Sequence, residues 1–340
     1  MKNLLLYYIK KRSLIVVIIS ILTLIFSMIC TAVTKESFHN AANDSWMLRK
    51  TYLNLLTSIF ITYALLIPIF EFSFKMNKRS IDLFYSLPLK KEKLYLTKFL
   101  LGLIELFIVF TVSFIFIVLH LVVITSKGNY NVNLIYYLYY YLIVLGFGSL
   151  LYSWVCFFFT KGNTIIDGII LTVLSFFVLQ IIAGNVIIPL HNARIIDRNY
   201  PYLQLNPFDG LVQFTYYFDK SISASKINYI FNNSTIISIV IMTVLSISLI
   251  PLLFITNNLK KAEDTSDINN EWYTYKLLLP IYSICLYSLT NLSFYYLVIM
   301  AISSYIGYII YNRSFKIKLI DLILLLSSNV IGFILYYINH

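Results

Sequence analysis

The feature that most restricts the fold of this chain is a series of long apolar segments separated by short polar ones. About 20 apolar residues in a row cross a bilayer as a helix, because a helix satisfies its own backbone hydrogen bonds there. Charged residues make up only 12% of the 340 residues, about half of the usual fraction in soluble domains. We therefore predict an all-α, polytopic membrane helical bundle, whose first six spans are residues 13–33, 52–70, 99–124, 134–159, 165–190 and 232–255.

The C-terminal part of the chain allows two span counts. Residues 277–312 contain no charged residue, and this run is too long for one helix but rather short for two. A break at residues 290–293 gives two spans if the first begins near Trp272. The alternative is one long helix with an interfacial piece. With a last span at residues 319–338, the chain has nine spans or eight.

Basic residues indicate the orientation in the membrane. With nine spans, 18 of the 26 lysines and arginines lie in the segments on the same side as the N-terminus. Because basic loops stay in the cytoplasm, we expect a cytoplasmic N-terminus. This bias also accounts for the net charge of +11 without nucleic acid as a partner.

The first twelve residues place basic side chains around an apolar centre, which predicts a short interfacial helix. A signal peptide is the competing interpretation. The apolar run at residues 13–33 is too long for one, and no convincing cleavage site follows it.

The most basic segment, residues 75–98, joins the second and third spans. Ser80 can cap a short helix there, which would place Asp82 in the first turn, where a negative charge is favoured. Pro88 disfavours helical geometry at Leu87 and should end this helix.

The same short helix is amphipathic. Ile81, Phe84 and Tyr85 follow one another at spacings that put them on one face. A helix of this kind, held at the membrane surface between two spans, is suited to contact a soluble partner. An ordinary surface helix with basic flanks is the alternative interpretation.

The run Arg79-Ser-Ile-Asp82-Leu-Phe-Tyr-Ser-Leu-Pro88, followed by a basic stretch and Tyr95-Leu-Thr-Lys98, resembles the first cytoplasmic loop of ABC-2 type exporter permeases. The likeness is greatest to the Ytr-like and peptide-toxin-exporter permeases of Gram-positive bacteria. In that family this loop carries a coupling helix that docks on the ATP-binding subunit. The resemblance assigns the ATPase contact to Arg79, Ile81, Asp82, Phe84, Tyr85, Leu87 and Pro88.

The resemblance also implies an architecture. It predicts an ABC-2 type (type V exporter) core of six spans plus two or three C-terminal spans. Its parts would be an elbow helix at residues 1–12, the core at 13–255 with a coupling loop at 75–98 and an external loop at 191–229, a cytoplasmic linker at 256–276, and C-terminal spans at 277–340.

The function implied by the resemblance is outward transport of an amphipathic substrate, a peptide or an antimicrobial compound. Two ATP-binding subunits and a second permease, either a copy or a paralogue, would complete the transporter. The location would be a bacterial cell membrane.

Motifs for chemistry within the chain are absent from the sequence. It contains no P-loop, no H-E-x-x-H and no G-x-S-x-G motif. The four histidines are scattered, and Cys30, Cys156 and Cys285 lie in apolar runs without metal-ligand spacing. We expect no catalytic, cofactor-binding or metal-binding residues, so that a partner subunit would bind and hydrolyse ATP.

Glu105 is the ionisable residue placed deepest within a predicted span. A carboxylate inside a membrane is costly and suggests a functional polar site. The alternative is a carboxylate near the inner interface that pairs with a basic residue such as Lys98, and Glu71 and Asp167 are expected still closer to that interface. Two other functions remain open, namely a gradient-driven secondary transporter and a non-transporting immunity or sensing protein.

Overall fold

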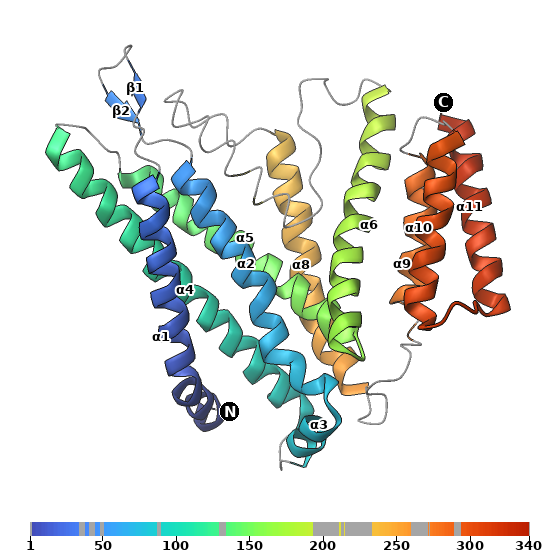
Figure 1. Ribbon diagram of the computed structural model, residues 1–340, viewed down its shortest axis with the longest axis horizontal. Helices are drawn as coiled ribbons and strands as arrows, with labels where there is room; N and C mark the ends of the chain where they lie inside the picture. The colour runs from blue at the N-terminus through green and yellow to red at the C-terminus, as the bar shows by residue number, and fades with distance from the viewer. Residues whose placement is uncertain are drawn as a thin grey trace. The chain divides into compact units, whose positions relative to one another are not determined.

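A computed structural model describes residues 2–33, 38–40, 45–47, 51–86, 90–128, 134–192, 211, 214, 233–259, 271, 273–288 and 294–339. This part of the chain is helical apart from one small hairpin, as predicted (Figure 1). In the hairpin, β1 (Phe38–Asn40) pairs antiparallel with β2 (Ser45–Met47).

Five helices in the described part are long and apolar enough to cross a membrane, so the chain is a multi-pass membrane protein. Their apolar segments coincide with the second to the sixth predicted spans. These segments are Leu56–Met76, Lys91–Leu119, Tyr137–Lys161, Ile165–Ile182 and Val240–Asn257.

The helices divide between two compact units. Unit 1 comprises Met1–Phe72, Pro88–Cys156 and Pro207–Asn258. It contains α1 (Lys2–Val33), α2 (Thr51–Phe72), α4 (Lys91–Gly128), α8 (Asn233–Leu259) and most of α5 (Leu134–Lys161).

Helix α4 is the centre of unit 1, because it contacts both α1 and α2. Aromatic rings fill the space between these helices; the rings of Phe60 on α2 and Phe110 on α4 lie 4.3 Å apart. Helices α2 and α5 approach closely at Gly148, where any side chain would overlap the ring of Phe60. The Thr57 and Tyr140 hydroxyls share a buried hydrogen bond of 2.6 Å between the same two helices.

Unit 2 comprises Ser73–Leu87, Phe157–Asn206 and Leu259–His340. Its helices are η1 (Ser73–Met76), α3 (Lys78–Tyr85), α6 (Ile165–Asn192), α9 (Tyr275–Ser288), α10 (Phe294–Asn312) and α11 (Leu319–Asn339).

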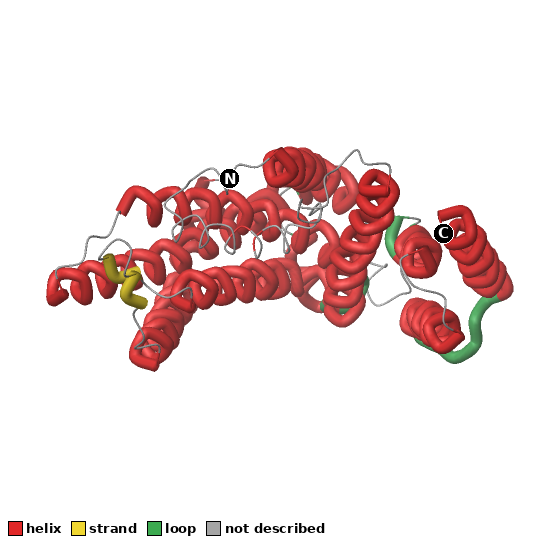
Figure 2. Tube along the Cα trace, turned by 90° about the horizontal axis from the view of Figure 1, so that it is seen from above, coloured by secondary structure: helices red, strands yellow, loops and turns green. Residues whose placement is uncertain are grey.

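Helix α9 is the centre of unit 2 and contacts α6, α10 and α11. Seen from above in Figure 2, two of the three C-terminal helices appear nearly end on and the third is tilted. The Ser283 hydroxyl of α9 donates to that of Ser304 on α10 over 2.9 Å. The turn after α10 places Arg313 in the left-handed region, with φ of 51°, and the Arg313 side chain forms an ion pair with Asp167 of α6.

Several helix boundaries differ from the predicted ones. Helix α1 runs from Lys2 to Val33 without the interruption expected after Arg12, since residues 10–13 contain no helix breaker. Helix α4 has 38 residues and a length of about 57 Å, well beyond the ~30 Å of a bilayer core, because it begins eight residues before the predicted span and ends four residues after it.

Within residues 277–312 the described residues belong to two helices, α9 and α10. The predicted break at 290–293 lies outside the described residues. Helix α9 has 14 residues, about 21 Å, which is shorter than a bilayer core. Most of the predicted external loop at 191–229 and of the linker at 256–276 also lies outside the described part.

Candidate functional site

The predicted surface helix exists as α3, but its start was predicted wrongly. Asn77, not Ser80, is the cap: its side-chain oxygen accepts a hydrogen bond of 3.1 Å from the backbone N–H of Arg79. Ser80 therefore lies inside the helix, and Asp82 lies beyond the first turn. The helix ends at Tyr85, and Ser86 closes it with a backbone N–H bond of 2.9 Å to the Asp82 carbonyl.

The apolar face of α3 is partly occupied within unit 2. Ile81 is only 2% exposed. The Phe84 ring lies 4.5 Å from the ring of Phe74 in η1 and is partly exposed. Arg79 and Asp82 are exposed, and Tyr85 is partly exposed. Of the seven predicted contact residues, α3 thus presents four at its surface, while Leu87 and Pro88 lie outside the described residues.

The segment before α3 is anchored by a lysine that the sequence did not single out. Lys75 is 5% exposed, and its ammonium group donates to the backbone carbonyl of Thr160 at the end of α5. In the sequence, a lysine that will be buried cannot be distinguished from the exposed lysines of the same basic segment. Its role becomes visible only once α5 is placed beside η1.

Lys161 is a second buried lysine in this part of unit 2. Its ammonium nitrogen lies 4.8 Å from the ring centre of Phe157 and 5.6 Å from that of Tyr273. Burial raises the pKa of the Tyr273 hydroxyl, so the ring faces this cation in its neutral form. Aromatic faces stabilise such a cation without neutralising it.

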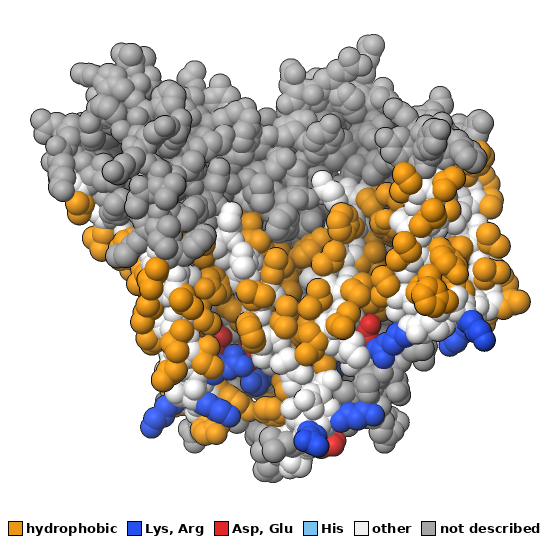
Figure 3. Space-filling view, in the orientation of Figure 1, with side chains coloured by type: hydrophobic (Ala, Val, Ile, Leu, Met, Phe, Trp, Pro, Cys, Tyr) orange, Lys and Arg blue, Asp and Glu red, His pale blue; other side chains and the backbone are white. Residues whose placement is uncertain are grey.

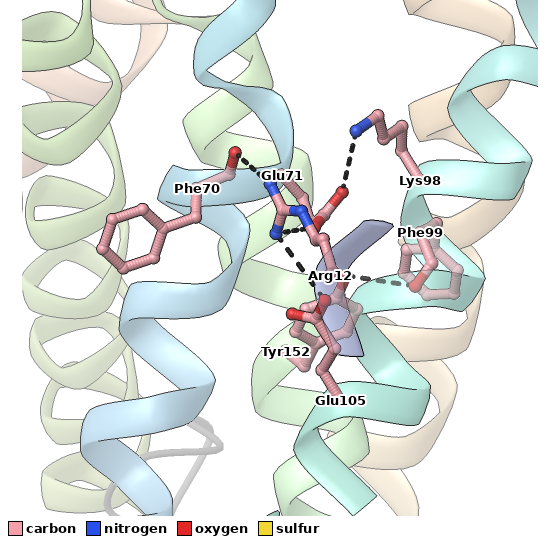
Figure 4. A network of polar contacts seen from close by, with 7 residues as sticks. All are labelled: Arg12, Phe70, Glu71, Lys98, Phe99, Glu105 and Tyr152. Atoms are coloured by element: carbon pink, nitrogen blue, oxygen red, sulfur yellow. Dashed lines mark hydrogen bonds and ion pairs between the residues drawn. The ribbon is translucent and has the colours of Figure 1, made fainter. Parts of the chain in front are cut away.

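A cluster of four charged side chains lies within unit 1 (Figure 4). It consists of Arg12 from α1, Glu71 from the end of α2, and Lys98 and Glu105 from α4; we call it the ion-pair cluster. Glu71 forms ion pairs with Arg12 and, at 3.2 Å, with Lys98. The Arg12 guanidinium also lies 3.7 Å from the Glu105 carboxylate.

Burial makes these pairings necessary. The Glu71 side chain is 0% exposed and that of Lys98 is 5% exposed. Charges removed from water need partners, because an uncompensated buried charge is strongly destabilising. The ion-pair cluster holds two cations and two carboxylates, so its formal charges balance.

Neutral groups complete the surroundings of the ion-pair cluster. Arg12 donates to the Phe70 carbonyl over 3.3 Å, and the Tyr152 hydroxyl donates to the Phe99 carbonyl over 3.1 Å. The Lys98 ammonium lies 4.2 Å from the ring centre of Tyr8. Burial raises the pKa of the Tyr8 hydroxyl, which keeps this ring neutral.

The pairing differs from the predicted one. The sequence suggested Lys98 as the partner of Glu105, but the ion pairs place Arg12 next to Glu105 and give Lys98 to Glu71. Glu71, which was expected near the membrane interface, is fully enclosed by protein. Asp167, expected in a similar position, is also buried and pairs with Arg313.

The arrangement ties together the two helices that enter and leave the segment carrying α3. Glu71 lies two residues before η1, and Lys98 lies in the second turn of α4. Their ion pair therefore holds the end of α2 against the beginning of α4, and Arg12 adds α1 to the same point.

The described residues offer no site for metal binding or thiol chemistry. No group of three or more His, Cys, Asp or Glu side chains that could hold a metal ion occurs among them. Cys156 is a fully buried free thiol. Comparison with protein-family models, with curated proteins and with solved structures finds no match for this chain.

Proposed function

We propose that this chain is the transmembrane permease subunit of an ATP-driven ABC-2 type exporter in a bacterial cell membrane, with its N-terminus in the cytoplasm. The observation that carries the proposal is the capped amphipathic helix α3 between α2 and α4, two helices of spanning length that the Glu71–Lys98 ion pair joins. Such a helix gives a soluble partner protein a surface from which it can move both spans at once.

In this proposal the energy comes from a separate ATP-binding subunit, two copies of which would serve two permeases. The second permease would be a copy or a paralogue of this chain. The substrate would be an amphipathic molecule, a peptide or an antimicrobial compound, moved outward. These features follow the sequence resemblance of the segment around α3.

The docking surface would consist of the exposed part of α3. Arg79 and Asp82 would form ion pairs with the ATP-binding subunit, and Phe84 and Tyr85 would supply apolar contact. Ile81 would hold α3 on the permease rather than touch the partner, since it is already buried. Leu87 and Pro88 remain predicted contacts.

The first test is to purify the tagged chain from its native membranes in a mild detergent and identify the proteins that accompany it. The proposal expects a stoichiometric protein with a P-loop. The chain alone, under conditions that preserve other ABC transporters, would contradict the proposal.

A charge reversal then tests the place of docking. Asp82→Arg should greatly reduce recovery of the ATP-binding protein while leaving the amount of chain in the membrane unchanged. Glu92→Arg is the matched control, because Glu92 is also an exposed carboxylate but lies on α4. Equal losses in both variants would place the contact outside α3.

A gradient-driven secondary transporter is the second candidate, favoured by one observation. Glu105 is 7% exposed and places a carboxyl group inside a predicted span. A proton carrier should lose gradient-driven uptake or efflux in membrane vesicles when Glu105 is changed to Gln. In the exporter, Glu105→Gln should leave the stimulation of the partner's ATPase intact, because Glu71 still pairs with both cations.

A further inference from the structure

An apolar groove of about 330 Å³ runs along the surface of unit 2, between α6, α9 and α10. Its floor includes Leu279, which is 3% exposed, and Gly307, where a side chain would come within 2.6 Å of a Leu279 methyl group. Its rim includes Val173 and Phe177, which are 47% and 59% exposed. Gly307 thus allows Leu279 of α9 to pack close against α10 at the floor of the groove.

The position of the groove along the span indicates its depth in the membrane. On α6 it is lined from Ile169 to Phe177, a length of about 12 Å. One leaflet contributes about half of the ~30 Å hydrocarbon core, so the groove has the length of one leaflet's acyl layer. It starts four residues after the apolar segment of α6 begins at Ile165 and therefore belongs to the leaflet at that end.

The end of the groove at Ile169, Tyr275 and Ile310 adjoins basic groups. Lys276 follows Tyr275 directly, and the turn after Ile310 contains Arg313, Lys316 and Lys318. Lys276, Lys316 and Lys318 are exposed. Figure 3 shows Lys and Arg side chains gathered at one edge of the apolar surface of the C-terminal helices.

A buried polar group lies at the same end. The Tyr275 side chain lines the groove and is 2% exposed, and among the described residues none forms a hydrogen bond with its hydroxyl. A phenol enclosed in this way leaves a donor available for an oxygen atom that enters from the groove.

From these observations we infer that the groove binds one anionic phospholipid of the surrounding bilayer. One acyl chain lies along Val173, Leu279 and Gly307, and the phosphate lies beside Lys316 and Lys318, with the Tyr275 hydroxyl donating to an ester or phosphate oxygen. A volume of about 330 Å³ suits a thin chain and not a helix, whose diameter is about 10 Å. Basic side chains next to an apolar groove recognise anionic head groups.

The tail site is tested with phosphatidylglycerol that carries a spin label on its acyl chain, in vesicles of phosphatidylcholine containing the full chain. Electron paramagnetic resonance measures the motionally restricted label. Val173→Trp should fill the groove and remove one tightly held lipid per chain. Val244→Trp is the matched control, because Val244 is an exposed valine on α8 in unit 1 and should change nothing.

The head-group site is tested in the same vesicles by comparing labelled phosphatidylglycerol with labelled phosphatidylcholine. Each of Lys316→Gln and Lys318→Gln should lower the preference for phosphatidylglycerol about five-fold, because one lysine near an anionic lipid surface contributes a factor of about five to binding. Lys10→Gln with Lys11→Gln is the control for charge alone, because both are exposed lysines on α1.

Three results would overturn the inference. Equal restricted fractions in the wild type and in Val173→Trp would exclude an acyl chain from the groove. An unchanged preference in both lysine variants would exclude the head-group site. Loss of self-association in Val173→Trp, with lipid retention unchanged, would make the groove an interface with a second copy of this chain.

Discussion

Glu71 offers the most direct test of the ion-pair cluster. Changing Glu71 to Gln keeps the shape of the side chain but removes the carboxylate that Arg12 and Lys98 share. The ion-pair cluster then holds two cations and one carboxylate. Lys98, only 5% exposed, loses the carboxylate that lies 3.2 Å from its ammonium group.

The size of the effect follows from this burial. Removal of one partner from a buried ion pair destabilises a protein by about 3–5 kcal/mol. We expect Glu71→Gln to fall near the lower end of this range, about 3 kcal/mol, because Arg12 keeps Glu105 at 3.7 Å and is 21% exposed. Lys98→Met should cost a similar amount, since it leaves the charge on Glu71 with Arg12 alone.

The double variant distinguishes charge balance from packing. Glu71→Gln with Lys98→Met leaves one cation, Arg12, facing one carboxylate, Glu105. A buried pair replaced by neutral groups of similar volume is often tolerated. We therefore expect the double variant to lose only about 1–2 kcal/mol, less than either single variant, which is a coupling far from additivity.

The measurement is equilibrium unfolding of the purified chain in mixed micelles of a mild detergent and sodium dodecyl sulfate, followed by far-ultraviolet circular dichroism. Glu92→Gln is the control, because Glu92 is an exposed carboxylate on the same helix and the interactions of an exposed charge contribute at most about 1 kcal/mol. If the losses of the two single variants simply add in the double variant, the charges do not compensate one another and the reasoning is refuted.

Three further predictions concern single contacts. Gly148→Ala should destabilise the chain by about 1–3 kcal/mol, because the new methyl group overlaps the ring of Phe60. Gly146→Ala is the control, because its new methyl group meets nothing within 4 Å; its free energy of unfolding should be unchanged or higher by up to about 1 kcal/mol. Asn77→Ala removes the cap of α3 and should destabilise this helix by about 1 kcal/mol, which should raise amide hydrogen exchange in the first turn of α3. Asn77→Ser keeps a capping side chain and should leave that exchange slow. Tyr152→Phe removes a buried hydrogen bond of 3.1 Å and should cost about 1 kcal/mol of unfolding free energy; no change would mean that another donor takes its place.

The spans were predictable because bilayer thickness imposes a length on apolar runs. Five predicted spans coincide with helices of spanning length. Helix α3 was predictable too, because its apolar residues follow a helical spacing. Its cap was not, since Asn77 and Ser80 are both good capping residues and the choice depends on where η1 ends.

The pairing within the ion-pair cluster could not be predicted from local sequence. Lys98 lies two turns before Glu105 on the same helix, which made it the obvious partner. The cation found beside Glu105 is Arg12, from a helix far away in the chain, and nothing in the sequence encodes the contact between α1 and α4 directly. The apolar groove was missed for the same reason, because its lining comes from three helices, α6, α9 and α10.

The order of synthesis sets a requirement on how this protein enters its membrane. Arg12 leaves the ribosome before Glu71, and both precede Lys98 and Glu105. The Arg12–Glu71 ion pair can form once α2 has been made, whereas the ion pairs of Lys98 and Glu105 must wait for α4. Biogenesis of this protein thus has a late step in which the first helix settles against the fourth.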